Sequence, residues 1–144
     1  MKPRFAPEYW ADLFRRGSYE DLVQITSFLC GAGAYDPSKD DYGLGLGPFL
    51  LIESLNWFAQ SIRSGSITYF EATLGSRQQL MARALSTHAP AGFAEQYEAG
   101  VRAWQAGNSL SAFDAWVDQN DAANNAWLRL LAADLQPQIL KIVS

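Results

Sequence analysis

The residues whose type and spacing point most directly to chemistry are five acidic side chains between positions 95 and 121, a segment with a single basic residue. They are Glu95, Glu98, Asp114, Asp118 and Asp121. The three aspartates are spaced four and three residues apart, which places them on one face of a helix. Such a row would suit a cationic cleft on another protein, because complementary potentials accelerate encounter and select the register. We therefore expect these five residues to bind a partner.

Each aspartate also has a local interpretation, which the sequence leaves open. Asp114 lies three residues after Ser111, as in a capping box, where two side chains satisfy backbone N–H groups at a helix start. Asp121 can cap a following helix, and Asp118 can simply be solvated. Because runs of charge are most often exposed faces, the acidic row is either a contact surface or a set of helix ends and solvated side chains.

A second acidic candidate lies in the one long irregular stretch, residues 31–47, whose five glycines, one proline and four charged residues disfavour a helix. Loops of this length inside a compact domain are often functional. Its glycines lack the spacing of a phosphate-binding loop, and its aspartates lack the glycine and glutamate of a calcium loop. Turn formation is one role, for Asp36 and Asp40. The other is contact with a basic partner, for which the candidates are Asp36, Asp40, Asp41 and Tyr42.

Cysteine and histidine are too few for most metal sites. The chain has one of each, Cys30 and His88, so it supplies neither an internal disulfide nor the usual cysteine and histidine zinc sites. We expect no metal and no cofactor. Cys30 lies on an apolar segment and is expected to be buried, and His88 is expected at a helix end. Paired carboxylates among the 15 acidic residues remain the open route to an enzyme.

Length and charge narrow the class of protein. The 144 residues fit one domain, and 49% hydrophobic residues suffice for a core. With 15 acidic and 11 basic residues the net charge is −4, which disfavours direct binding to nucleic acid or to an anionic membrane. No apolar run approaches the ~18 residues of a membrane span, and residues 1–12 contain no apolar stretch of signal-peptide length. We expect a cytoplasmic protein whose partner is another protein.

Helix start and stop signals recur along the whole chain, and no segment shows the β-branched alternation of a strand. The sequence predicts a single all-α domain over residues 1–144, a bundle of about seven or eight short helices. Residues 1–47 should form an N-terminal helical hairpin with the long loop, and residues 48–144 should form a helical core.

Two further helix starts have the spacing of a capping box, a serine followed three residues later by an acidic or amide side chain. Ser18 with Asp21 predicts the start of the second helix, and Ser76 with Gln79 predicts the start of a helix in the middle of the chain. In each box the serine oxygen would accept a bond from a backbone N–H, while the second side chain accepts one from the N-cap residue.

A helix break is expected near residues 119–122. One continuous helix through this segment would place Asn120 and Asn124 in its apolar seam. Burying two unpaired amides there would cost ~1–3 kcal/mol each, so two helices are favoured over one.

Residues 64–75, SGSITYFEATLG, resemble the signature of the DNA-mimic-protein-like family of small bacterial helical proteins. That signature is approximately Asn-Gly-Gly-aromatic-x-Gln-Phe-Phe-x-Asn-Ser-x-Gly and follows a helix with an early glutamate, a role that Glu53 would take here. The similarity extends from about Leu50 to about Ile139 and implies a helical fold. A glycine-dependent turn should drive two aromatic rings back against the preceding helix. The residues that carry the signature are Gly65, Tyr69, Phe70 and Gly75.

The resemblance implies a non-enzymatic protein that works by occupying the surface of another protein. One family member is a DNA mimic with acidic side chains in place of phosphates, and similar domains occur beside bacterial toxin genes as candidate immunity proteins. Our first hypothesis is an inhibitor or immunity protein that occludes a toxin or a nucleic-acid-handling enzyme through acidic patches. The alternatives are a DNA mimic that sequesters a DNA-binding regulator and a small hydrolase with paired carboxylates. Because 11 cations dilute the 15 carboxylates, the inhibitor is favoured over the mimic.

Overall fold

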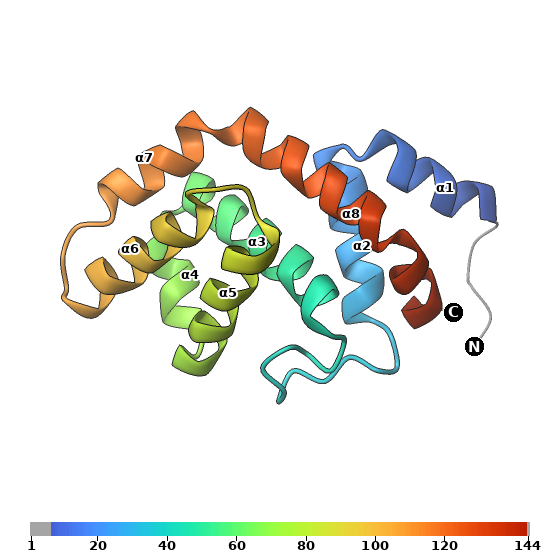
Figure 1. Cartoon of the computed structure of the whole chain (residues 1–144), viewed down its shortest axis with the longest axis horizontal. Helices are drawn as coiled ribbons and strands as arrows, with labels where there is room; N and C mark the ends of the chain where they lie inside the picture. Colours follow the sequence, from blue (N-terminus) through green and yellow to red (C-terminus); the bar gives the residue numbers. More distant parts are fainter. Residues whose placement is uncertain (1–6, 144) are drawn as a thin grey trace. The chain divides into compact units, whose positions relative to one another are not determined.

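The computed structural model describes residues 7–143, which form eight α-helices with no β-strand among them (Figure 1). The predicted all-α class and number of helices are confirmed. Residues 31–45 connect the second and third helices without helical structure. The helices are α1 (Pro7–Arg16), α2 (Tyr19–Cys30), α3 (Leu46–Arg63), α4 (Ser66–Ala72), α5 (Gly75–His88), α6 (Phe93–Gln105), α7 (Ser111–Gln119) and α8 (Asp121–Val143).

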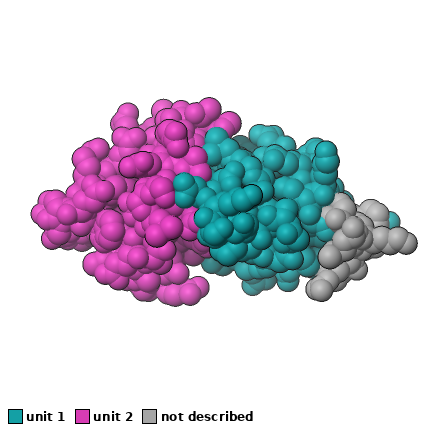
Figure 2. All heavy atoms as spheres, turned by 90° about the horizontal axis from the view of Figure 1, so that it is seen from below, with its two compact units in different colours: residues 1–55, 125–144 teal, residues 56–124 magenta. Residues whose placement is uncertain are grey.

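The chain divides into two compact units, which Figure 2 colours separately. Unit 1 comprises residues 1–55 and 125–144, and unit 2 comprises residues 56–124. Both boundaries fall inside helices, α3 and α8, so each of these helices contributes residues to both units. Neither boundary coincides with the one expected after residue 47.

The start of α2, in unit 1, is fixed by the predicted capping box. Ser18 Oγ accepts a hydrogen bond from the Asp21 N–H at 3.2 Å, and Asp21 Oδ2 accepts one from the Ser18 N–H at 3.1 Å. Arg16 adds an ion pair to Asp21, with Nη2 and Oδ1 3.0 Å apart. The hydrogen bonds from Arg16 and then from Ser18 lower the pKa of Asp21 to about 2, from an ordinary value of 3.8. The prediction at Ser18 is confirmed.

Two glycines of unit 1 allow a close approach by α8. A Cβ on Gly47 would overlap the side chain of Leu135, and a Cβ on Gly17 would lie 2.8 Å from Cγ of Arg129. Gly17 also has a φ of +58°, a conformation that glycine adopts without steric cost. The C-terminal part of α8 therefore packs on the start of α3 and on the turn between α1 and α2.

An aromatic cluster forms the centre of unit 2. Trp57 of α3 is fully buried and stacks on Phe113 and Trp116 of α7, with ring centroids 5.6 and 5.9 Å apart. Tyr97 of α6 meets Trp57 edge to face at 5.1 Å, and its hydroxyl lies 2.7 Å from the hydroxyl of Tyr69 in α4. Such ring pairs contribute about 0.5–1.5 kcal/mol each beyond their burial. The cluster thereby joins α3, α4, α6 and α7.

The expected break between the last two helices is confirmed, since α7 ends at Gln119 and α8 begins at Asp121. The break does not expose both asparagines. Asn124 is 1% exposed, and its Nδ2 donates to the Val117 carbonyl at 3.4 Å. Its Oδ1 has no hydrogen-bond partner among the described residues. The folded protein therefore still bears part of the free-energy cost that was predicted for burying this amide.

The capping boxes predicted at Ser76 and Ser111 are wrong. The N-cap residues of α5 and α7 are Leu74 and Leu110, and neither of these residues supplies a side-chain hydrogen bond to its helix start. Both serines lie inside the first helical turn, whereas the serine of a capping box is the N-cap residue, which precedes that turn. The carboxylate of Asp114 consequently serves another helix, as described below.

Candidate functional site

α6 and α7 run antiparallel within unit 2. Phe93, the first residue of α6, meets Trp116 near the end of α7, with ring centroids 5.3 Å apart. Further along α6, Gly100 faces Phe113 so closely that a Cβ there would overlap the ring. The start of α6 therefore lies beside the end of α7, where α8 begins. We call the exposed carboxylates at this place the acidic end; they are Glu95, Asp118 and Asp121.

One carboxylate of the acidic end opposes its helix dipole. Glu95 and Asp121 lie in the first turns of α6 and α8, where negative charge is favourable. Asp118 lies in the last turn of α7, which contains no basic side chain, and this placement costs about 0.3–1 kcal/mol. Glu95 and Asp118 form no ion pair with any described residue, so their charges face solvent.

Asp114 does not belong to the acidic end. It is half-buried, and its Oδ1 accepts a hydrogen bond from the N–H of Ser66, the first residue of α4, at 2.9 Å. Its Oδ2 faces Gly65, where a Cβ would come within 3.3 Å. Gly65 has φ +91° and ψ 148°, a conformation close to one that only glycine adopts readily. Asp114 is thus a cap for α4, which removes it from the expected contact surface.

The aspartates of the 31–45 loop act in its own turns. Asp36 Oδ1 accepts bonds from the N–H and the hydroxyl of Ser38 at 3.0 and 2.6 Å, and these bonds lower the pKa of Asp36. Asp41 Oδ1 accepts a bond from the Gly43 N–H at 2.9 Å. This confirms the turn role predicted for Asp36; the bond of Asp41 was not predicted, since the other residue indicated as a turn former was Asp40. Asp40 is exposed, whereas Asp36 and Asp41 are half-buried.

Tyr42 lies in the interior of unit 1, so its predicted place on a contact surface has to be corrected. It is 8% exposed, and its hydroxyl donates to Oε2 of Glu53, itself 2% exposed, at 2.6 Å. Its ring packs on Tyr35 and Phe49, with centroids 5.2 and 5.8 Å away. A φ of +59° is uncommon for a tyrosine, and the buried pair holds it. Tyr42 therefore anchors the loop on α3, and Glu53 is the residue that receives it.

Cys30 is exposed at the end of α2, so its expected burial is wrong. Partial desolvation raises the pKa of the thiol; a hydrogen bond with Tyr35 opposes this, and the charge of Glu53 adds to it. A raised pKa keeps the thiol protonated, which does not favour a nucleophile. His88 is the last residue of α5, the helix-end position that the sequence predicts.

The signature residues around α4 have architectural positions. Tyr69 and Phe70 are 4% and 0% exposed. Both rings contact Tyr97 of α6, at 6.1 and 5.8 Å, and Phe70 also contacts Phe113 of α7 at 5.5 Å. A Cβ on Gly75 would meet nothing, so local space does not require glycine there. The ring contacts described here join α4 to α6 and α7, whereas the sequence predicted contacts with the preceding helix.

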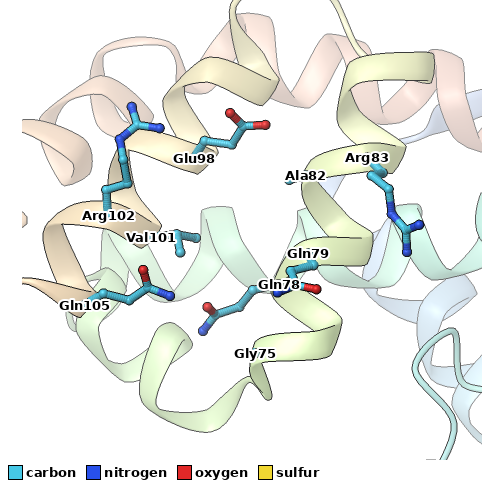
Figure 3. A pocket seen from close by; sticks show the side chains of 9 residues that line it. All are labelled: Gly75, Gln78, Gln79, Ala82, Arg83, Glu98, Val101, Arg102 and Gln105. Atoms are coloured by element: carbon cyan, nitrogen blue, oxygen red, sulfur yellow. The ribbon is translucent and has the colours of Figure 1, made fainter.

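Unit 2 also contains a pocket that the sequence analysis missed, a cavity of about 530 Å³ between α5 and α6 (Figure 3). Small-molecule sites typically have volumes of ~300–1,000 Å³. Its polar lining includes the carboxamides of Gln78, Gln79 and Gln105, and Glu98 is its single carboxylate. A single acid does not provide the paired carboxylates of a hydrolase. Glutamines on helices are ordinary helix formers, so no sequence pattern distinguishes these three.

Among residues 7–143, no three or more histidine, cysteine, aspartate or glutamate side chains are grouped to hold a metal ion. None of the helices within this range combines the length and apolar character needed to cross a bilayer.

No protein-family model, curated protein or solved structure shows a significant match to the chain. The resemblance at residues 64–75 therefore stays a prediction. The acidic end and the pocket between α5 and α6 are the two features of the described residues that bear on function.

Proposed function

We propose that the protein is a non-enzymatic binding protein of the inhibitor or immunity type, which occludes a basic cleft on a partner protein with the acidic end. The observation that carries this proposal is the position of Asp118. Its carboxylate is exposed in the last turn of α7, where it opposes the helix dipole and forms no ion pair with any described residue. A side chain that lowers stability without supporting a neighbour is expected at a functional surface.

The surroundings of Asp118 suit a contact surface. Glu95 and Asp121 add negative charge at the same end of the α6 and α7 pair. This charge would attract a cationic partner. Trp116 is half-buried there, and tryptophan is enriched among residues that dominate binding energy. Its ring is held by stacking on Trp57 and by an edge contact with Phe93. A surface that is already rigid loses little conformational entropy on binding.

The expected partner is a toxin or another nucleic-acid-handling enzyme, because the clefts of such proteins are basic where they hold phosphates. We expect the complex to form in the cytoplasm. The loop carboxylates Asp36, Asp40 and Asp41 of unit 1 offer a second acidic surface. The proposal does not depend on them, since two of the three already bond within the loop.

Two double variants with the same change in charge test the proposal. Glu95→Gln with Asp118→Asn neutralises the acidic end, whereas Glu71→Gln with Asp134→Asn removes two exposed carboxylates elsewhere. The full-length forms are used to capture a partner from a lysate of the source organism, and the captured protein is then co-expressed with each form. We expect the wild type and the control to bind and inhibit the partner. The acidic-end variant should bind at least about tenfold more weakly, which is about 1.4 kcal/mol.

Three results would contradict parts of this proposal. Equal binding by the two double variants would exclude the acidic end as the contact surface. A captured protein that the wild type does not inhibit would exclude the inhibitor role. Duplex DNA that competes for the same partner at low salt, with an affinity that falls steeply as salt rises, would indicate DNA mimicry.

A further inference from the structure

The pocket between α5 and α6 contains an unpaired buried acceptor. Gln78 is 2% exposed, and its Nε2 donates to the carbonyl oxygens of Phe70 and Thr73 at 3.3 and 3.0 Å. Because both amide hydrogens are used in this way, the orientation of the carboxamide is fixed. Oε1 has no hydrogen-bond partner among the described residues. An acceptor buried without a partner is unfavourable and needs an explanation.

The direction of the Gln78 side chain connects this acceptor to the pocket. In Figure 3, Gln78 extends from α5 toward α6, and Gln105 extends from α6 toward α5. No hydrogen bond joins Gln105 to Oε1 of Gln78. A ligand group that donates a hydrogen bond from within the pocket would satisfy this oxygen.

Glu98 presents a second acceptor to the same space. Its carboxylate extends from α6 toward α5 in Figure 3 and forms no ion pair with any described residue. The guanidinium groups of Arg83 and Arg102 line the pocket but do not extend into the space between the helices (Figure 3). The polar groups directed inward are therefore the acceptors Oε1 of Gln78 and the Glu98 carboxylate, together with the Gln105 carboxamide, which can both donate and accept, and the charged group among them is negative.

These acceptors decide the chemical class of the ligand. An anion would set its lone pairs against Oε1 of Gln78 and its charge against Glu98, so the two arginines do not make an anion site. A guanidinium has five N–H donors in one plane and pairs with a carboxylate through two parallel hydrogen bonds. Its aliphatic stem would lie against Ala82 and Val101, the apolar part of the lining. We propose that this pocket binds an alkyl guanidinium group, which pairs with Glu98 and donates to Gln78.

Two probes and one control ligand test this proposal on the full chain. Agmatine represents a free alkyl guanidinium, and N-acetyl-arginine methylamide represents an arginine side chain of a protein. N-acetyl-citrulline methylamide, whose urea group is neutral, is the control. Binding is followed by calorimetry and by NMR shifts of the backbone amides of α5 and α6. We expect saturable binding of both guanidinium probes and at least about tenfold weaker binding of the citrulline compound.

Three variants locate the binding. Glu98→Gln should weaken agmatine binding at least about tenfold, and Ala82→Leu should block it by filling the pocket without a change in charge. Glu71→Gln removes an exposed carboxylate of α4 and should leave binding unchanged. Thermal melting checks that each variant folds. Equal loss in Glu71→Gln and Glu98→Gln would overturn the proposal, and so would probes that leave the α5 and α6 amides unshifted.

Competition distinguishes the two sources of the ligand group. If agmatine displaces the partner captured through the acidic end, the guanidinium belongs to an arginine of that partner. If agmatine binds without displacing it, the ligand is a small molecule. Glu98 is not part of the acidic end, so failure of the pocket proposal leaves the proposed function standing.

Discussion

The carboxylate of Asp114 caps a helix that begins 48 residues earlier, because its Oδ1 accepts a hydrogen bond from the N–H of Ser66 at 2.9 Å. The N-cap residue of α4 is Gly65, which has no side chain to perform this role. The bond joins α7 to the start of α4 within unit 2. One member of the acidic row thus serves stability, while its neighbour Asp118 does not.

Replacing Asp114 should weaken the fold. Asp114→Ala removes the cap of α4 and should lower the free energy of unfolding by about 1 kcal/mol, whereas Asp114→Asn keeps an acceptor oxygen and should lose less. Urea denaturation at neutral pH measures both. Asp118→Ala is the control and should show no loss. An Asp114→Ala variant as stable as the wild type would contradict the capping role.

Replacing Asp118 should have the opposite effect. Asp118→Asn removes a negative charge from the last turn of α7 and should raise the free energy of unfolding by about 0.3–1 kcal/mol at low ionic strength. The gain should shrink as salt is added, because the dipole interaction is screened. Urea denaturation at two salt concentrations measures this. A loss of stability would show that Asp118 supports the fold after all.

Lowering the pH should remove the contribution of Asp21 to the free energy of unfolding. The pKa of this carboxyl is about 2 in the folded protein and 3.8 ordinarily, so the folded state favours the ionised form. Its stabilisation is fully present above pH ~4 and is lost as the pH falls from about 4 through about 2. Denaturation between these pH values should therefore show a loss that Asp21→Asn lacks. Equal pH dependence in both proteins would be inconsistent with the Arg16 and Ser18 bonds.

Loss of the Tyr42 hydroxyl, which donates to the buried carboxylate of Glu53, should lower the stability of the protein. Tyr42→Phe keeps the ring packing but removes a donor to a buried carboxylate, and should lower the free energy of unfolding by about 1–3 kcal/mol. The matched control is Tyr19→Phe, since Tyr19 is 46% exposed. Thermal and urea unfolding measure both. Similar stability in the two variants would mean that the hydrogen bond contributes nothing net.

Gly100 offers a test of packing between α6 and α7. Alanine usually stabilises a helix interior by about 1 kcal/mol over glycine, but a Cβ at Gly100 would overlap the ring of Phe113. Gly100→Ala should therefore destabilise by about 1–3 kcal/mol, and adding Phe113→Leu should recover part of the loss. Gly75→Ala, where the space is open, should not destabilise. A stabilising Gly100→Ala would show that the two helices are further apart than described.

Local signals predicted the fold where the interacting residues are close in sequence. The capping box of Ser18 and Asp21 and the break at Asn120 depend on spacings of a few residues, and both are confirmed. The same spacing at Ser111 and Asp114 gave a wrong prediction, because the Asp114 carboxylate accepts a hydrogen bond from the N–H of Ser66, which is far away in sequence. Spacing shows which side chains can cap a helix, and tertiary contacts decide which helix they cap.

The candidate site was only partly predictable for a related reason. Exposure of Glu95 and Asp118 follows from their charge, since unpaired carboxylates are rarely buried. Burial of Tyr42 follows from its bond to Glu53 and from loop geometry, which no periodic pattern reports. The pocket depends on two helices bringing Gln78 and Glu98 to one space, and neither residue belongs to a recognisable motif.

The division of the chain into units has a consequence for its synthesis. Unit 2 is one uninterrupted stretch, whereas unit 1 needs residues 125–144, which are made after unit 2. At ~5–20 residues per second, the ribosome delivers the α8 residues that cover Gly17 and Gly47 on the order of seconds after the acidic end and the pocket. Unit 1 can therefore be completed only after every residue of unit 2 has been synthesised. A chain that ends at residue 124 would contain every residue of unit 2 but would lack the α8 residues that cover Gly17 and Gly47.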